Sequence, residues 1–224
     1  MKNTVKDKPI LSIETSQALC GACVYFSGEK YFEVISNKKN IHAEKIIESI
    51  DMALNLAGVG LNDLEYIAVS NGPGSFTGLR IGMSVVKGLA LGSSLPIVPV
   101  PTFEAIAFQI CNYLFDGLTF IIANKVNSEE VYYAKFTIKG NSYIFAENLT
   151  IMHKSKFLKQ IESETLIFGN AIEHEGKPQQ NKMNIIVPNP MYVAGWSRKF
   201  GKNLITTDFD FLEPNYLKNF FVKE

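Results

Sequence analysis

The residues best suited to chemistry gather in one glycine-rich stretch, Asn71–Gly92. The hydroxyls of Ser75 and Thr77 and the guanidinium of Arg80 follow a Gly-Pro-Gly turn that ends at Gly74. Backbone N–H groups at the start of a helix carry partial positive charge, so they can hold a phosphate or carboxylate. The stretch therefore predicts an anion site, unless its small residues serve close helix packing instead. The residue types alone do not decide between these two interpretations.

The spacing of this stretch excludes three known motifs. A P-loop needs G-x-x-x-x-G-K-[ST]. Here Gly74 and Gly78 are one residue too close, and Leu79-Arg80 stands where the motif has Lys followed by Ser or Thr. A nucleophile elbow needs glycine two residues either side of its serine, and these positions hold Pro73 and Thr77. The same threonine breaks the dinucleotide fingerprint G-x-G-x-x-G. We therefore expect no catalytic residue in the stretch.

Two strands and a helix must position this chemistry. The apolar run Tyr66–Val69 predicts a buried strand before the glycine turn, and the apolar residues after Ser75 recur at helical spacing. Another strand, Ile10–Ile13, ends at Glu14 and the hydroxyl residues Thr15 and Ser16. Actin-like ATPases place a short hydroxyl-rich hairpin turn, at the carboxyl end of their first strand, against a nucleotide phosphate. Thr15 and Ser16 therefore join the predicted anion site, although an ordinary polar turn is the simpler interpretation.

Four glycines in the helix after Ser75 need an explanation: Gly78, Gly82, Gly88 and Gly92. An interior glycine costs a helix about 1 kcal/mol relative to alanine. A helix keeps several of them where something must approach its backbone closely. A phosphate, a neighbouring strand and a helix of a partner chain each satisfy this requirement.

Histidine and cysteine spacing predicts no metal site. The three histidines are His42, His153 and His174, and no two of them are four residues apart as a helical metal pair requires. Cys20 and Cys23 form a C-x-x-C sequence within a predicted strand, where residues three apart point to opposite faces. We expect these two thiols to be small core side chains.

Charge and composition indicate a soluble cytoplasmic protein. Lys plus Arg and Asp plus Glu are both 22 in 224 residues, so the formal net charge is zero. Such a chain lacks the basic footprint of a stand-alone nucleic-acid binder. Three cysteines, an odd number, fit a reducing compartment. No apolar run reaches the roughly 18 residues of a transmembrane helix, so no membrane association is expected.

The order of predicted elements suggests a duplicated α/β unit. Three strands precede alternating helices and strands, and after Pro101 three strands appear again. We predict an N-terminal subdomain at residues 1–101 and a C-terminal subdomain at residues 102–224. The pattern also predicts a late strand at Ile185–Val187 and a helix from about Met191 to Phe200.

Four further segments accompany the glycine stretch: Ile10–Ser16, His42–Glu44, Glu130–Tyr132 and Pro214–Lys218. Together they resemble the signature of the bacterial TsaB (YeaZ) family, densely over residues 10–107 and sparsely afterwards. The resemblance implies an actin/Hsp70-like, ribonuclease H-like ATPase fold of two duplicated α/β subdomains, the second degenerate. It also implies a non-catalytic scaffold or activator subunit. The complex concerned transfers threonylcarbamoyl to N6 of adenosine 37 in tRNAs that read codons beginning with A.

The same resemblance implies partners and cofactors. The catalytic paralogue TsaD carries the metal site, and a TsaB protein forms a heterodimer with it on which the ATPase TsaE docks. The chain would then meet tRNA only indirectly. A homodimer of the chain when alone is a further hypothesis, because a glycine-lined helical face left without its partner tends to associate. No cofactor is expected in the isolated chain, although ATP or ADP could bind at the interface of the complex.

Under this interpretation the helix glycines make room for a partner helix. The expected interface combines the helix at residues 42–57 with the glycine face: His42, Ile46, Ile50, Gly78, Gly82, Met83, Val86 and Gly88.

The alternative functions are a residual ATPase or a metallopeptidase of the glycoprotease type. Asn124-Lys125 stands where an actin-like ATPase has Asp-Gly, and Gly169-Asn170 is a thin remnant of an adenosine-binding turn. Lys125-Val126-Asn127 replaces an Asp-Ala-Arg segment of the family. These departures argue against an ATPase.

Overall fold

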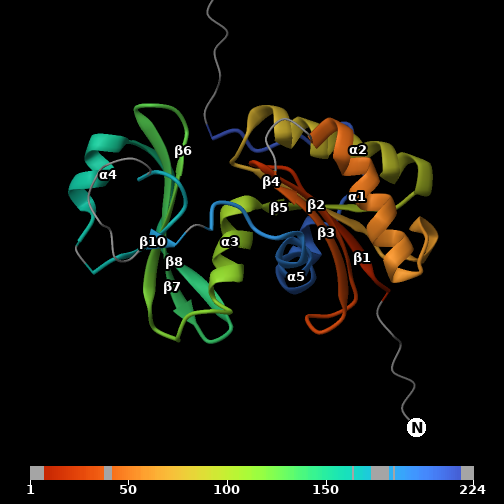
Figure 1. The fold of residues 1–224 in the computed structure, drawn as a ribbon, viewed down its shortest axis with the longest axis horizontal. Helices are drawn as coiled ribbons and strands as arrows, with labels where there is room; N and C mark the ends of the chain where they lie inside the picture. The colour runs from red at the N-terminus through yellow and green to blue at the C-terminus, as the bar shows by residue number, and fades with distance from the viewer. Residues whose placement is uncertain (1–7, 38–41, 163, 173–181, 184, 218–224) are drawn as a thin grey trace, which may run out of the picture. The chain divides into compact units, whose positions relative to one another are not determined.

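The computed structural model describes residues 8–37, 42–162, 164–172, 182–183 and 185–217. The chain forms two compact units, each built on a five-stranded sheet (Figure 1). The first unit runs to Thr102 and also includes Asn189–Pro214. The second unit comprises Phe103–Pro188 and the residues from Asn215 onward.

The sheet of the first unit has the strand order β3-β2-β1-β4-β5. Its strands are β1 (Ile10–Glu14), β2 (Leu19–Tyr25), β3 (Tyr31–Asn37), β4 (Ile67–Gly72) and β5 (Ile97–Pro101). The first three strands form an antiparallel meander, and β4 lies parallel to both β1 and β5. A short 3-10 turn, η1 (Leu61–Asp63), precedes β4.

Helices cover the two faces of this sheet. Alternate strand residues such as Leu11 and Ile13 share a core with α1 (His42–Ala57) and α2 (Phe76–Ser93). The intervening Ser12 faces the other way, and its Oγ donates to the carbonyl of Pro190 at 2.7 Å. Pro190 begins α5 (Pro190–Phe200). Because side chains on a strand alternate between faces, α5 must lie opposite α1 and α2.

The second unit repeats this topology with the order β10-β9-β6-β7-β8. Its elements are α3 (Thr102–Ile110), β6 (Thr119–Lys125), β7 (Glu130–Lys139), β8 (Ser142–His153), α4 (Lys154–Gln160), β9 (Leu166–Phe168) and β10 (Lys182–Met183). An aromatic-rich core lies between α3 and the sheet, and a smaller core lies under α4. The matching strand orders support a duplication, and the very short β9 and β10 agree with a degenerate second copy.

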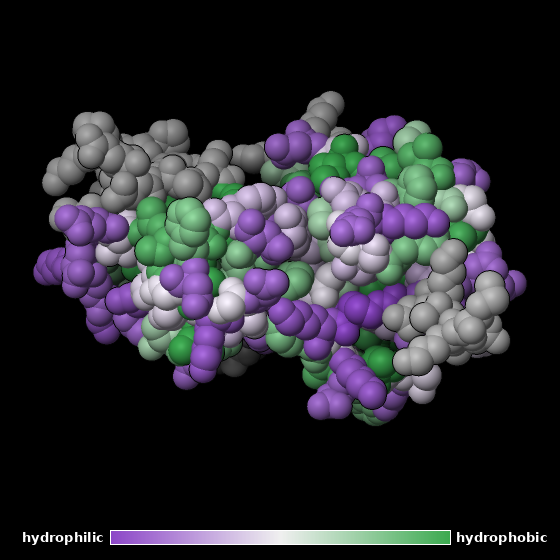
Figure 2. All heavy atoms as spheres, turned by 90° about the horizontal axis from the view of Figure 1, so that it is seen from below, coloured by the Kyte–Doolittle hydropathy of each residue, from purple (hydrophilic) through white to green (hydrophobic). Residues whose placement is uncertain are grey.

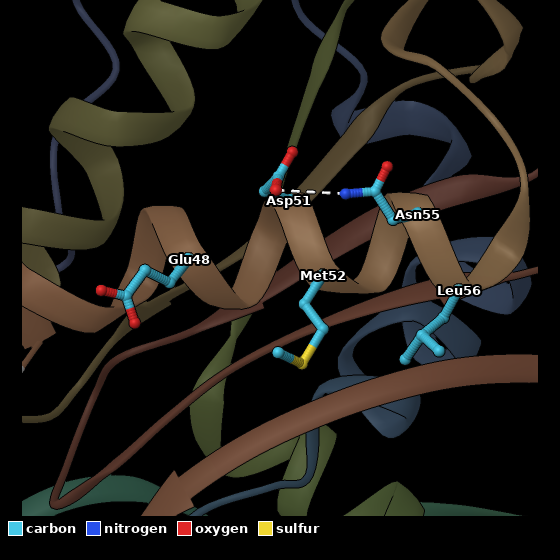
Figure 3. Close-up of a pocket in the computed structure, with 5 residues that line it drawn as sticks. All are labelled: Glu48, Asp51, Met52, Asn55 and Leu56. Atoms are coloured by element: carbon cyan, nitrogen blue, oxygen red, sulfur yellow. Dashed lines mark hydrogen bonds between the residues drawn. The ribbon is translucent and has the colours of Figure 1, made fainter.

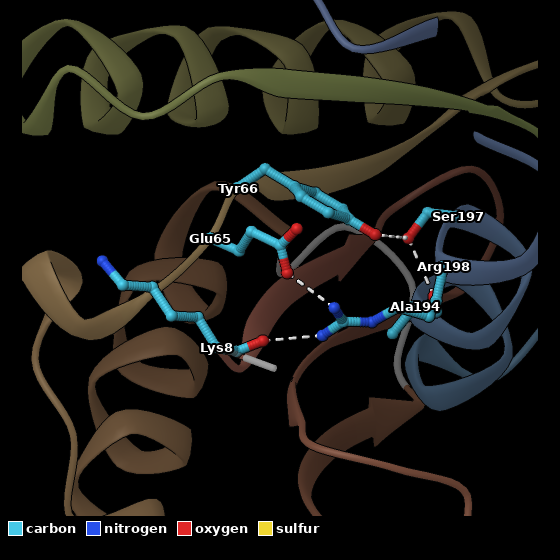
Figure 4. Close-up of polar contacts among 6 residues, drawn as sticks. All are labelled: Lys8, Glu65, Tyr66, Ala194, Ser197 and Arg198. Carbon is cyan, nitrogen blue, oxygen red and sulfur yellow. Dashed lines mark hydrogen bonds and ion pairs between the residues drawn. The ribbon is translucent and has the colours of Figure 1, made fainter. Parts of the chain in front are cut away.

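The expected division at residue 102 needs one correction, because the C-terminal helix returns to the first unit. This helix is α5 (Pro190–Phe200), followed by the 3-10 turn η2 (Gly201–Leu204). Figure 4 shows how Arg198 fixes it: the guanidinium donates to the Glu65 carboxylate at 2.6 Å and to the Lys8 carbonyl at 2.7 Å. At the start of α5, the Met191 N–H donates to the Glu33 carboxylate at 2.7 Å. Because these contacts join segments far apart in the sequence, no local sequence pattern predicts the return of α5 to the first unit.

The late strand predicted at Ile185–Val187 was wrong. Two residues upstream, β10 pairs with β9 instead. The carbonyl of Ile186 accepts a hydrogen bond from the Asn124 amide at 2.8 Å, which is a side-chain contact and not a sheet ladder. Pro188 and Pro190 follow and lack the N–H groups that a strand would need.

The surface mixes polar and apolar residues. On the face drawn in Figure 2, hydrophilic and hydrophobic residues are interspersed, and neither kind covers it alone. Among the helices of the described residues, none has the length and apolar character needed to cross a bilayer.

Candidate functional site

The glycine loop and the β1–β2 turn pack directly against each other. The Ser75 N–H donates to the Ser16 carbonyl at 2.6 Å, which joins the start of α2 to the turn after β1. An added Cβ at Gly74 would lie 2.5 Å from that same carbonyl oxygen. The two segments that the sequence assigned to one site therefore do meet.

The helix glycines explain this close approach. A Cβ at Gly78 would overlap the Thr15 carbonyl oxygen, and a Cβ at Gly82 would overlap the Thr15 hydroxyl. Gly88 and Gly92 differ, because a Cβ on either would meet nothing within 4 Å. Of the three candidates for the close neighbour, a strand end of the same unit accounts for Gly78 and Gly82.

A buried carboxylate lies beneath this contact. Glu14 is fully buried, its Oε1 accepts from the Ser16 N–H at 2.5 Å, and its Oε2 accepts from the Ser70 hydroxyl. Burial raises the pKa of Glu14 to about 7, and the hydrogen bonds from Ser16 and Ser70 only partly oppose this rise. Sequence reasoning missed Glu14 and Ser70 as a pair. Ser70 carried a signal, because it is a polar residue at the end of an otherwise apolar strand.

Three buried oxygens near the turn have no hydrogen-bond partner among the described residues: Thr15 Oγ1, Ser16 Oγ and Asn71 Oδ1. The Ser75 hydroxyl is already used, because it caps α2 by accepting from the Gly78 N–H at 3.2 Å. A pair of unsatisfied hydroxyls beside a helix start is compatible with the predicted anion site. The neighbouring Glu14 carboxylate and the tight packing on α2 both oppose an anion. The anion site stays a prediction.

The structure does not bring every predicted anion ligand together. Thr15, Ser16, Gly74 and Ser75 are in contact at the turn, as described above. Thr77 and Arg80 are exposed instead, and the Arg80 guanidinium lies 3.8 Å from the centroid of the Phe76 ring. This cation–π contact directs the arginine along the outside of α2.

The predicted partner interface needs a correction, because most of its residues lie inside the first unit. Six of the eight are buried: Ile46, Ile50, Gly78, Gly82, Met83 and Val86. They pack against the sheet or the β1–β2 turn, so they cannot touch a partner. Gly88 is exposed, and the side chain of His42 lies outside the described part of the structure.

The exposed side of α1 carries apolar residues that sequence reasoning overlooked. Ile47, Met52 and Leu56 are 53%, 54% and 58% exposed. A hollow of about 470 Å³ is lined by Glu48, Asp51, Met52, Asn55 and Leu56. In Figure 3, Met52 and Leu56 extend from the same side of α1. Leu91 on α2 is 70% exposed. The available signal was the four-residue spacing of Met52 and Leu56, which places both on one side of α1, apart from the buried Ile46 and Ile50.

The two loops of the second unit that an actin-like ATPase would use for phosphate and adenosine, at Asn124-Lys125 and Gly169-Asn170, are hydrogen-bonded to each other. The Asn124 Oδ1 accepts from the Asn170 N–H at 3.3 Å, and the Asn170 Oδ1 accepts from the Lys125 N–H at 2.7 Å. A Cβ at Gly169, whose φ is +105°, would overlap the Ala123 carbonyl. The predicted remnant of an adenosine-binding turn is therefore held closed by amide side chains.

The replaced segment Lys125-Val126-Asn127 forms the turn between β6 and β7. The Asn127 Oδ1 accepts from the N–H groups of Glu129 and Glu130, at 2.8 and 2.9 Å. Its amide nitrogen donates to the Glu130 carboxylate at 2.7 Å. Asn127 therefore stabilises the turn.

No group of three His, Cys, Asp or Glu side chains suited to a metal occurs within the described residues. Cys20 and Cys23 lie on opposite faces of β2, as predicted. Cys20 belongs to the core under α1 and α2, whereas Cys23 pairs across the strands with Ser12 on the α5 side. Burial raises the pKa of both thiols, that of Cys20 to about 11.

Comparisons with known proteins find related sequences and a related fold. The family model described as TsaD, tRNA N6-adenosine threonylcarbamoyltransferase, matches residues 33–192. A protein of Buchnera aphidicola from Baizongia pistaciae, named tRNA threonylcarbamoyladenosine biosynthesis protein TsaB, is 30% identical over 83% of this chain and 87% of its own length. The protein of that name from Haemophilus influenzae is 32% identical over 56% of this chain and about half, 52%, of its own length.

A solved structure from Pseudomonas aeruginosa, described as an uncharacterized protein with similarity to peptidase YEAZ, superposes with a TM-score of 0.79. It is 20% identical, and the superposition covers 94% of this chain and 100% of that one. With the matching family model, it confirms the predicted α/β fold of the actin-like ATPase type with two sheets.

Proposed function

The chain belongs to the TsaB family of tRNA threonylcarbamoyladenosine biosynthesis proteins, and from this we infer that it is a non-catalytic scaffold or activator subunit. Its complex would transfer threonylcarbamoyl to N6 of adenosine 37 in tRNAs that read codons beginning with A. The closed glycine loop carries the non-catalytic part of this proposal. Gly78 and Gly82 bring α2 against Thr15, which leaves little room for a phosphate where an actin-like ATPase would hold one.

The catalytic partner is a TsaD-like subunit. The family model and two transferase relatives, from Geobacter and Cereibacter sphaeroides, connect this chain to that enzyme class. A TsaE-like ATPase docks on the pair, and the chain forms a homodimer when it is alone. tRNA contacts it only indirectly, because a chain with equal numbers of acidic and basic residues offers little attraction for phosphates.

The partner binds the exposed side of α1 and α2. Ile47, Met52, Leu56 and Leu91 present large apolar side chains to solvent, which is typical of a protein interface. The open backbone at Gly88 and Gly92 lets a partner helix approach α2 closely. This surface replaces the buried glycine face that the sequence suggested.

Nucleotide binding belongs to the complex and not to the isolated chain. The two loops that would hold phosphate and adenosine are occupied by contacts within their own units. ATP or ADP would then bind only where the partner supplies further ligands. No observation here favours a residual ATPase or a metallopeptidase.

Binding of the purified TsaD-like subunit tests the interface. We expect Leu56→Asp and Leu91→Asp each to weaken binding at least about tenfold, because a buried charge has no partner there. Ile144→Asp is the matched control, because Ile144 is 50% exposed on β8 of the second unit. Equal affinity of all three variants would exclude the α1–α2 surface.

A further inference from the structure

One aromatic side chain in the C-terminal segment is displayed to solvent by a defined turn. Phe209 and Leu212 pack against the core of the first unit, and the Leu212 N–H donates to the Phe209 carbonyl at 3.3 Å. Phe211 lies between them and is 86% exposed. Phe209 and Leu212 are anchored in the core and Phe211 is not, so the turn presents the Phe211 ring to solvent.

The segment before the turn is fixed to the sheet. Thr206 pairs with Ile97 of β5 through two backbone hydrogen bonds, of 2.8 and 2.9 Å. The Thr206 hydroxyl also accepts from the Asp208 N–H at 3.0 Å. Because the segment is already held in place, binding of a partner to Phe211 would cost little conformational entropy.

Three carboxylates surround this ring in sequence: Asp208, Asp210 and Glu213. Asp208, Asp210 and Glu213 are all exposed, and none forms an ion pair with another described residue. Such a cluster repels phosphate groups, so it disfavours both nucleic acid and an anionic membrane. A protein pocket that is apolar inside and lined by Lys or Arg at its rim complements both the ring and the charges.

The turn belongs to the unit whose surface was assigned above to the TsaD-like subunit. Phe209 and Leu212 pack against the core that α1 and α2 also cover. We propose that Phe211 is a second anchor for that subunit, inserting into an apolar pocket with a basic rim. This proposal rests on the proposed function and adds a contact outside α1 and α2.

The test measures the affinity of the full chain for the purified TsaD-like subunit at low and at high salt. Phe211→Ala should weaken binding at least about tenfold without lowering the melting temperature, because aromatic anchors dominate interface energies and this ring is exposed. The triple variant Asp208→Asn, Asp210→Asn, Glu213→Gln should bind more slowly at low salt and lose most of the salt dependence of association. Phe115→Ala is the control, because Phe115 is 84% exposed in the second unit.

The outcomes separate this proposal from the proposed function. Wild-type affinity of Phe211→Ala would overturn the anchor while leaving the α1–α2 interface intact. If the wild-type chain does not bind the subunit at all, the proposed function itself fails. Equal losses for Phe211→Ala and Phe115→Ala would show a general effect of removing surface aromatics, and would also overturn the anchor.

Discussion

Replacing Glu14 by glutamine should change how stability depends on pH. In the folded chain the pKa of Glu14 is raised from 4.5 to about 7, mainly by burial. The folded state therefore holds the proton more tightly than the unfolded state. Stability is lost as the pH rises from 4.5 to about 7, and above that range the full cost of a buried charge is present.

Glutamine keeps the local hydrogen bonds without the charge. Its oxygen can accept from the Ser16 N–H, and its NH₂ group can donate to the Ser70 hydroxyl. A pKa difference of this size corresponds to about 3 kcal/mol. Relative to wild type, Glu14→Gln should gain about 3 kcal/mol of unfolding free energy between about pH 4 and about pH 8.

Urea unfolding of both proteins across this pH range measures the difference, in which all other titrating groups cancel. Glu29→Gln, at the exposed turn between β2 and β3, controls for the loss of one negative charge. A stability difference between Glu14→Gln and wild type that does not change with pH would refute the reasoning.

Two glycine comparisons test the packing of the loops. Gly82→Ala should destabilise the first unit by about 1–3 kcal/mol, because the added Cβ would clash with the Thr15 hydroxyl. Gly88→Ala in the same helix should stabilise it by up to about 1 kcal/mol, because nothing lies near that position. Thermal unfolding measures both effects, and equal effects would contradict the assignment. Gly169→Ala should destabilise the second unit by more than about 1 kcal/mol, because its φ of +105° and the Ala123 carbonyl both oppose a side chain. Gly140→Ala should cost less, because Gly140 has φ +59° and open space around it. A larger loss of stability at Gly140 would count against this account.

Local pattern predicted much of the fold. Apolar runs and helical spacing predicted the three opening strands, the helices around residues 42–57 and 76–92, and the duplication, because each depends on periodicity along the chain. The return of α5 to the first unit depends on Arg198 reaching Glu65 and Lys8, which no periodicity records.

The candidate site was predictable only in part. Glycines in a helix interior indicated that something approaches α2, but not whether it is Thr15 or another chain. Gly82 and Gly88 look alike in sequence and differ only in what lies opposite them. The same limit hid the exposed side of α1, because Ile46 and Ile47 are both apolar and only one of them is buried.

Reconstituted tRNA modification tests the central claim most directly. Purified TsaD-like and TsaE-like subunits, threonylcarbamoyl-AMP and unmodified tRNA would be incubated with and without this chain, and threonylcarbamoyladenosine at position 37 would be quantified. We predict that modification requires the chain, survives Glu14→Gln, and fails with Leu56→Asp. Full modification without the chain, or none with it, would contradict its assignment as an activating subunit.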